Sequence, residues 1–200
     1  MQAIETINRA LFLALNATPE TPHGLVAAAI LIANDAILLA PTALVCLWLT
    51  GGDERRELAL RACAVGFLAL GINQLIGLAW YHPRPFAIGL GHTFLPHAPD
   101  SSFPSDHATL LSALSFTFFQ GGKRQLGLFM LVVDLAVAWA RVFIGVHFPF
   151  DMLGAALVAG LACLLVKPLW MMSGPFVTKT SIALYRKLLV LPIGRGWLRR

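Results

Sequence analysis

Long runs of apolar residues, separated by short polar stretches, dominate the chain between residues 25 and 170. Runs of about 20 mostly apolar residues are typical of helices that cross a membrane. Five segments have this character or come close to it, and the third is the shortest: residues 25–50, 58–80, 105–120, 125–144 and 148–170. The pattern therefore predicts an all-α, polytopic membrane helix bundle with about five transmembrane helices.

Both ends of the chain carry amphipathic segments instead of spans. Residues 3–15 are too short to cross a membrane comfortably and are interrupted by polar positions, which predicts an interfacial helix within residues 1–20. The same interruptions argue against a cleavable signal peptide. Residues 173–200 form a basic tail that we expect on a membrane surface. We therefore divide the chain into a membrane domain, residues 1–172, and a tail, residues 173–200.

The connections between the predicted spans are uneven. Residues 51–56 and 121–124 form short, basic links that contain glycine, whereas residues 81–104 form a long link. This long link holds five of the twelve prolines: Pro83, Pro85, Pro96, Pro99 and Pro104. Long irregular connections in compact proteins are usually functional or disordered. Whether this loop gates access to a site is open at this stage.

The composition excludes two broad classes of protein. Hydrophobic residues make up 58% of the 200 positions and charged residues only 12%, while the mean hydropathy is +0.74. A soluble domain of this length has too little interior to bury so much apolar surface. Disorder requires the opposite balance, with low hydrophobicity and high charge. A membrane protein is the class that remains.

The charge pattern predicts an orientation in the bilayer. With five spans, twelve of the 15 Lys and Arg residues fall on the face of the short links and the tail, leaving only Arg9, Arg84 and Arg141 on the other. Basic residues gather on the cytoplasmic side. We therefore expect a cytoplasmic C-terminus and an outward-facing loop 81–104. Because topology explains the net charge of +5, no nucleic-acid partner is expected.

Three polar pieces of sequence meet on the predicted outer face. They are residues 83–85 after the second span, residues 104–107 at the start of the third, and Arg141, His147 and Asp151 around the junction of the last two. Ionisable groups at membrane depth are costly, so they are candidates for function. Two arginines, two histidines and a carboxylate therefore converge on one membrane level.

These residue types suit the binding of phosphate. Arg84 and Arg141 can each hold phosphate oxygens with two parallel hydrogen bonds. Ser105 is placed to cap the third span, where free backbone N–H groups favour an anion.

The histidines suit phosphoryl transfer. His147 and Asp151 are four residues apart, one helical turn, so the aspartate can hold one ring nitrogen and leave the other as a nucleophile. His107 is placed to protonate a leaving oxygen. No set of side chains resembles a metal cage, and the arginines supply the charge that a metal would bring. We therefore expect neither metal nor other cofactor.

The three pieces together resemble the type-2 phosphatidic-acid phosphatase superfamily. Its signature is K-x6-R-P, then P-S-G-H, then S-R-x5-H-x3-D, and this chain has Arg84-Pro85, residues 104–107, and Arg141-x5-His147-x3-Asp151. The motifs cover residues 71–154. Residues 81–86 and the Pro-Ser-Asp-His sequence are similar to the bacitracin-resistance type of undecaprenyl-diphosphatase within this superfamily.

The chain departs from the signature at three positions. The family lysine falls at Gly77, Asp106 replaces the glycine of the second motif, and Ala140 replaces the serine of the third. Asn73 lies one turn before position 77 on the same face, which makes it a candidate polar substitute. His82 beside Arg84 is a further candidate accessory residue, together with Asp106.

The resemblance implies a mechanism and a place in the cell. His147 would form a phosphohistidine, Asp151 would orient it, and His107 would protonate the leaving lipid phosphate. Arg84, Ser105 and Arg141 would hold the phosphoryl oxygens. The substrate would be a polyprenyl diphosphate in the bilayer of the bacterial inner membrane. Its hydrolysis to undecaprenyl phosphate on the outer, periplasmic face would recycle the lipid carrier of peptidoglycan synthesis.

Other functions remain open on the sequence alone. Phosphatidic acid and phosphatidylglycerol phosphate are alternative substrates, and lipid A is an alternative phosphoryl acceptor. A small transporter is the alternative from a different class, based only on Asp35 and Asp134 within predicted spans. Transporters usually have more spans and often an internal repeat, which this chain lacks. The oligomeric state is open.

Overall fold

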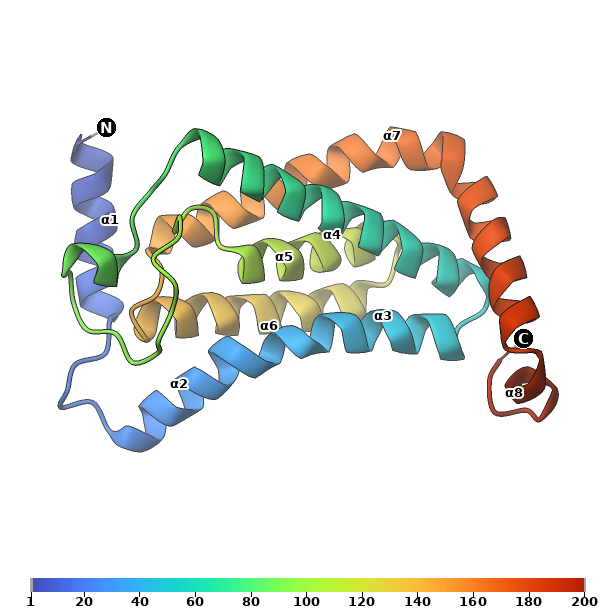
Figure 1. Ribbon diagram of the computed structural model, residues 1–200, viewed down its shortest axis with the longest axis horizontal. Helices are drawn as coiled ribbons and strands as arrows, with labels where there is room; N and C mark the ends of the chain where they lie inside the picture. Colours follow the sequence, from blue (N-terminus) through green and yellow to red (C-terminus); the bar gives the residue numbers. More distant parts are fainter. Residues whose placement is uncertain (1, 200) are drawn as a thin grey trace.

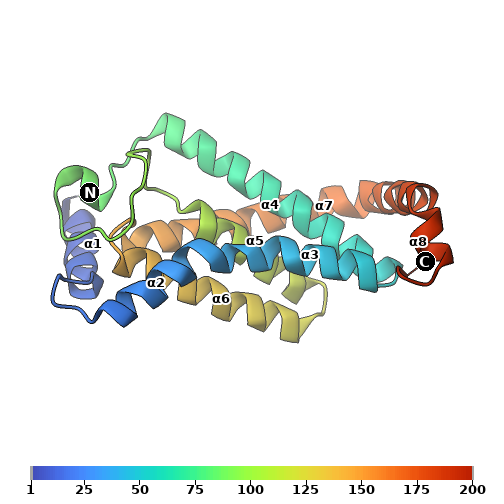
Figure 2. The same cartoon turned by 60° about the horizontal axis from the view of Figure 1, so that its bottom comes forward.

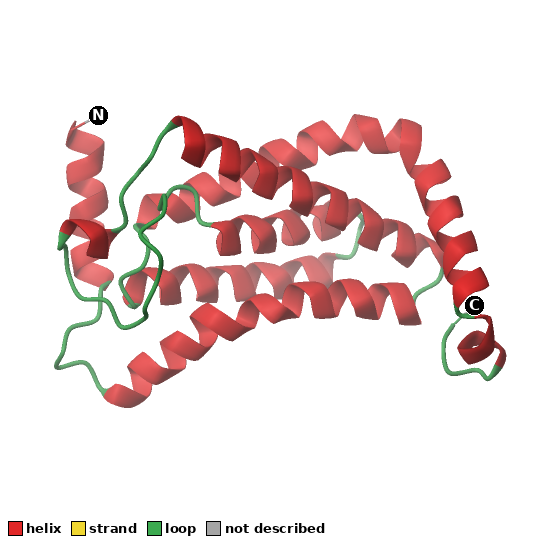
Figure 3. Cartoon of the chain, viewed as in Figure 1, coloured by secondary structure: helices red, strands yellow, loops and turns green. Residues whose placement is uncertain are grey.

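The structure, a computed structural model, describes residues 2–199, and every regular element in that range is a helix. In chain order the elements are α1 (Gln2–Leu15), α2 (His23–Asp35), η1 (Ala36–Leu38), α3 (Leu39–Thr50), α4 (Asp53–Ala79), η2 (Pro85–Ile88), α5 (Asp106–Gln120), α6 (Arg124–Phe143), α7 (Pro149–Leu188) and α8 (Val190–Gly194). Figure 3 shows helices joined mostly by short links, with one long connection between α4 and α5.

Long apolar helices form the body of the bundle. Four continuous helical stretches are long and apolar enough to cross a membrane: His23–Thr50, Asp53–Ala79, Arg124–Phe143 and Pro149–Leu188. They run roughly alongside one another in Figure 1. The predicted membrane helix bundle is confirmed.

The remaining predicted span forms α5, which lies in the middle of the bundle. It packs against α4, α6 and α7 and buries both apolar residues and hydroxyls such as Ser112 and Ser115. Its 15 residues correspond to about 22 Å of helix, less than the roughly 30 Å of a hydrocarbon core. Figure 1 shows that α5 begins deeper in the bundle than the neighbouring ends of α6 and α7. Because α5 is short, there is room for a site between its first residue and the end of the bundle that holds residues 81–104.

The two ends of the bundle differ. We call the end that holds residues 81–104 the loop end and the opposite end the tail end; they lie at left and right in Figure 1. The two short links, at residues 51–52 and 121–123, lie at the tail end with α8. The sequence placed these links on the same face as the C-terminal tail, and the structure agrees.

Helix α1 crosses the loop end of the bundle (Figure 1). The Oδ1 of Asn8 accepts a hydrogen bond from the backbone N–H of Phe150 at 3.0 Å, and the buried ring of Phe12 packs edge-on against Phe148. Ile4 and Ile7 remain exposed. The predicted amphipathic helix therefore forms and is fixed to the start of α7, while its place at a membrane surface stays a prediction.

Helix α7 is longer than the predicted last span. It continues from Pro149 to Leu188 through Pro168 and Pro175, so the predicted division at residue 172 falls inside it. Proline removes one backbone donor and bends a helix without always ending it. Figure 1 shows that α7 runs to the tail end and bends across it before it reaches α8. There the buried Arg56 donates to the carbonyl of Arg199 at 2.7 Å.

The two acidic residues within the spans have different surroundings. Asp134 on α6 is buried and accepts a hydrogen bond from the Ser112 hydroxyl of α5. Asp35 ends α2, where η1 breaks the first span, and it is exposed. Asp134 is therefore paired between two helices of the bundle.

Candidate active site

A pocket of about 400 Å³ lies at the loop end, over the start of α5. Its walls come from α4, the long loop, α5, α6 and the junction between α6 and α7. Six of the predicted site residues line it: Asn73, Arg84, Asp106, His107, Arg141 and His147. The structure therefore brings the three motifs together in one cavity.

His147 and Asp151 form a buried pair at the start of α7. Pro149 begins the helix, and the Oδ2 of Asp151 accepts a hydrogen bond from the backbone N–H of Phe148 at 2.8 Å. The same Oδ2 lies 3.1 Å from His147 Nδ1. The predicted one-turn spacing of the pair is confirmed. The hydroxyl of Ser102 also donates to this oxygen, so the carboxylate is held from three directions.

The other ring nitrogen of His147 faces Arg84. Nη1 of Arg84 lies 3.0 Å from His147 Nε2. Because a guanidinium only donates hydrogen bonds, Nε2 must be the acceptor, and the ring proton then lies on Nδ1 toward Asp151. Burial lowers the pKa of His147 to about 4, even though the hydrogen bond to Asp151 raises it. At neutral pH the ring is therefore neutral, with the lone pair of Nε2 on the side of Arg84.

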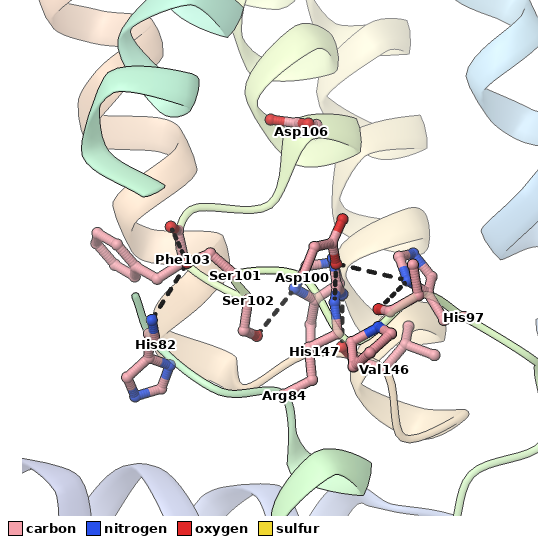
Figure 4. A network of polar contacts seen from close by, with 12 residues as sticks. His82, Arg84, His97, Asp100, Ser101, Ser102, Phe103, Asp106, Val146 and His147 are labelled. Atoms are coloured by element: carbon pink, nitrogen blue, oxygen red, sulfur yellow. Dashed lines mark hydrogen bonds and ion pairs between the residues drawn. The ribbon is translucent and has the colours of Figure 1, made fainter. Parts of the chain in front are cut away.

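Arg84 is itself fixed by the loop. It precedes η2, which begins with Pro85, and its side chain is almost fully buried. Nη1 also donates to the Val146 carbonyl at 2.9 Å, while Nε donates to Oδ1 of Asp100 at 2.7 Å. Figure 4 shows Asp100 and His147 gathered around this guanidinium. The arginine is therefore oriented before any ligand binds.

Arg141 lies in the last turn of α6 and is also buried. Nη1 donates to the Ala33 carbonyl at 3.1 Å, and Nη2 lies 3.3 Å from Nε2 of His97. Its Nε has no hydrogen-bond partner among residues 2–199. A buried donor without a partner in a pocket wall is suited to an anionic ligand.

The second motif places the side chains of Asp106 and His107 in the pocket wall and the hydroxyl of Ser105 next to it. His107, in the first turn of α5, lines the pocket. The carboxylate of Asp106 accepts hydrogen bonds from Asn73 at 2.8 Å and from Gln74 at 3.3 Å. The hydroxyl of Ser105 is fully buried and finds no partner within the described residues. Ser105 occupies the N-cap position of α5 without making the predicted side-chain capping hydrogen bond, and it lies next to the pocket lining without being part of it.

Gly77 leaves space in the pocket wall where the family lysine would stand. A Cβ at this position would meet its nearest heavy atom, the Cβ of Ser101, at 3.4 Å. Asn73 lies one turn away and also lines the pocket, but its amide is engaged with Asp106 and Thr109. Asn73 thus lies on the predicted face, and it contacts a carboxylate instead of standing free.

His82 points away from the pocket. Its Nε2 lies 3.5 Å from Oε2 of Glu5 on α1, and its ring packs against Phe148 and Trp80. Figure 4 shows the ring on the far side of the chain from His147. His82 lines a second cleft, between α1 and the loop. The structure therefore does not bring this candidate accessory residue into the site.

Three residues of the long loop reach the site without having been predicted there. His97 lies beside Arg141, Asp100 binds Arg84, and Ser102 binds Asp151. Figure 4 shows the three loop residues. Burial and the nearby arginines lower the pKa of His97, against the opposing effect of its hydrogen bond with the Ala98 carbonyl. The only signal in the sequence was the unusual length of the loop.

No cluster of three or more His, Cys, Asp or Glu side chains suited to hold a metal ion occurs within residues 2–199. The expectation of a site without cofactor stays a prediction.

Comparison with known proteins identifies the family. Residues 58–174 match the model of the PAP2 superfamily, and the chain belongs to this superfamily. It is a membrane enzyme, a lipid phosphatase.

Relatives cover most of the chain. A protein of Escherichia coli (strain K12) named "Putative undecaprenyl-diphosphatase YbjG" is 35% identical over 196 residues, which is 98% of this chain and 99% of the relative. Undecaprenyl-diphosphatase BcrC of Bacillus subtilis (strain 168) is 37% identical over 65% of this chain and 67% of its own. The crystal structure of Aquifex aeolicus LpxE is 20% identical and has a TM-score of 0.67, covering 81% of this chain and 95% of its own. The structural match supports the fold alone.

Proposed function

We propose that the protein hydrolyses undecaprenyl diphosphate to undecaprenyl phosphate and inorganic phosphate. One observation carries the proposal: the unprotonated Nε2 of a neutral His147 lies 3.0 Å from Arg84 in a pocket that Arg141 also lines. A buried nucleophile between two phosphate-binding cations suits phosphoryl transfer. The names of the two curated relatives support the choice of substrate.

In the first step, Nε2 of His147 attacks the terminal phosphorus of the diphosphate. The bond from that phosphorus to the bridging oxygen breaks, and its electron pair leaves with undecaprenyl phosphate. Asp151 holds the Nδ1 proton and stabilises the positive charge that develops on the ring. His107 takes up a proton when the anionic diphosphate binds beside it, and donates this proton to the leaving oxygen.

Arg84 and Arg141 hold the oxygens of the transferring phosphoryl group. Ser105 adjoins the pocket lining, and its hydroxyl, which finds no partner within residues 2–199, would complete this set. These donors stabilise charge that builds up on the phosphoryl oxygens in the transition state.

In the second step, water attacks the phosphohistidine. His107, now deprotonated, takes a proton from the water, the phosphorus–nitrogen bond breaks, and inorganic phosphate leaves. Both histidines return to their starting states, so the cycle balances without any further reactant.

The basic residues favour an outward-facing site. Twelve of the 15 Lys and Arg residues belong to the tail end by sequence, which favours a cytoplasmic tail end and an outer loop end. The pocket at the loop end would then meet diphosphate lipid on the periplasmic side of the inner membrane. Its product is the carrier that peptidoglycan synthesis uses again.

The test is a comparison of lipid substrates with purified protein in the presence of a metal chelator. We expect phosphate release from undecaprenyl diphosphate, with much lower kcat/KM for phosphatidic acid and phosphatidylglycerol phosphate. His147→Ala should abolish release, whereas His92→Ala, at an exposed loop position, should retain it. Faster turnover of either diacyl lipid, or release that requires a lipid A acceptor, would contradict the proposal. Full activity of His147→Ala would contradict the mechanism.

A further inference from the structure

A further cavity, of about 300 Å³, lies next to the pocket along α4 and α5. Helix α4 forms one wall, η1 and α3 form the other, and Leu110 and Leu114 of α5 form the floor. Every residue that lines it is apolar, the Cys63 thiol included. We call this cavity the apolar groove.

The apolar groove continues the pocket along the same two helices. On α4, Cys63, Gly66 and Leu70 line the groove, and Asn73 and Gly77 line the pocket. These positions follow one another at spacings of three and four residues, so they form a single stripe along α4. On α5, the groove residues Leu110 and Leu114 follow the pocket residue His107 at the same spacings.

The two cavities therefore lie end to end on one face of α4 and one face of α5. Leu70 and Asn73 are three residues apart, which is about 4.5 Å along the helix. The polar part of a ligand in the pocket is thus separated by less than one helical turn from the apolar groove.

The break in the first span separates α2 from α4 beside the pocket. Helix α2 packs against α6, whereas α3, beyond η1, packs against α4. As a result α2 and α4 diverge toward the loop end, as both Figure 1 and Figure 2 show. Leu78 of α4 lines the pocket and yet is 85% exposed, so the pocket reaches the lipid-facing surface of the bundle.

We propose that the apolar groove binds the head-proximal isoprene units of the substrate while its diphosphate occupies the pocket. This inference rests on the proposed function. A polyprenyl diphosphate has one chain attached directly to the diphosphate, and the apolar groove adjoins the pocket along α4 and α5. A diacyl lipid carries two chains on a glycerol, and a groove of about 300 Å³ is too small to take both. The groove therefore selects single-chain lipids.

The most informative substitution fills the groove far from the reacting atoms. Cys63→Trp places an indole about 15 Å along α4 from Asn73. The matched control is Cys46→Trp, because Cys46 on α3 is exposed and does not line the groove. We expect Cys63→Trp to lower kcat/KM for undecaprenyl diphosphate about tenfold through KM, since about two buried methylene groups lose their contacts. Dimethylallyl diphosphate, with one isoprene unit, should be turned over unchanged by both variants.

Equal losses on both substrates would mean that Cys63→Trp disturbs the helix packing, and the smaller Cys63→Leu then decides. The inference is overturned if Cys63→Leu also affects the long and short substrates equally, or if Cys46→Trp has the same effect as Cys63→Trp. A polyprenyl diphosphate with a photoreactive second isoprene unit provides a binding readout. It should label α4 between residues 62 and 70.

These outcomes separate the two proposals. Hydrolysis of undecaprenyl diphosphate without labelling of residues 62–70 would overturn the groove and leave the proposed function intact. Absence of hydrolysis by the wild-type protein would overturn the proposed function itself.

Discussion

Asp100 occupies a hydrogen-bonding position that the substrate needs. Its Oδ1 accepts a hydrogen bond from Nε of Arg84 at 2.7 Å, and both residues line the pocket. A phosphoryl group held by two parallel hydrogen bonds from Arg84 must take Nε as one of its donors or displace the carboxylate. Asp100 thus competes with phosphate, and Asp100→Asn removes the charge while keeping the shape of the side chain.

The exposure of the two partners sets the size of this competition. The side chain of Arg84 is 6% exposed and that of Asp100 is 62% exposed. An exposed ion pair contributes about 0.2–1 kcal/mol, and hydrogen bonds to charged groups about 1.5–3 kcal/mol. A half-exposed pair lies between these ranges, near 1 kcal/mol. Because an asparagine retains a neutral hydrogen bond of about half the strength, loss of the charge should tighten phosphate binding about twofold.

The assay measures the inhibition constant of inorganic phosphate, the proposed product, during hydrolysis of undecaprenyl diphosphate. Asp53→Asn is the matched control, because Asp53 is similarly exposed and pairs with Arg56 at the tail end. We expect tighter inhibition in Asp100→Asn and no change in Asp53→Asn. Weaker inhibition in Asp100→Asn would refute the competition and show that Asp100 instead holds Arg84 in its binding orientation.

Three further predictions concern stability and the missing lysine. The pKa of His147 is lowered to about 4 in the folded protein, so stability that is present above pH 6.5 should be lost as the pH falls toward 4, by up to about 3 kcal/mol. Melting temperatures measured across this pH range should fall less in His147→Gln than in the wild-type protein. Equal losses in the two proteins would contradict the lowered pKa. In Gly154→Ala the new Cβ would lie 2.3 Å from the ring of Phe103, so this variant should lose about 1–3 kcal/mol in thermal unfolding. Gly160→Ala, which meets nothing within 4 Å, should not be destabilised, and equal effects would refute the packing argument. Gly77→Lys should be accommodated and should lower the KM for undecaprenyl diphosphate, because it adds a cation to the pocket; a raised KM would show that the pocket does not tolerate the family lysine.

The span pattern was predictable from the sequence because helices in a membrane bundle are apolar over most of their surface. The start of α5 was predicted to within one residue, at Ser105 instead of Asp106. The end of the last span was not, because Pro168 bends α7 without ending it. Local composition indicates where a helix can cross a membrane, but it does not indicate whether the same helix continues beyond the apolar segment.

The contact between His147 and Asp151 was predictable because they lie one turn apart, and their geometry depends only on the local helix. The contributions of Asp100 and Ser102 were not, since they depend on the path of an irregular loop that no periodicity specifies. The partner of Asp134 was hidden for a related reason: Ser112 lies on another helix, and their contact depends on how α5 and α6 pack.

The central claim is that His147 carries the phosphoryl group, and the most direct measurement is isolation of the phosphoenzyme. Protein mixed with undecaprenyl diphosphate labelled in its terminal phosphate, and quenched rapidly in alkali, should hold label on a peptide containing His147. The label should be stable in alkali, released in acid, and absent from His147→Ala. Label on any other residue, or an enzyme that turns over substrate without ever becoming labelled, would contradict the account.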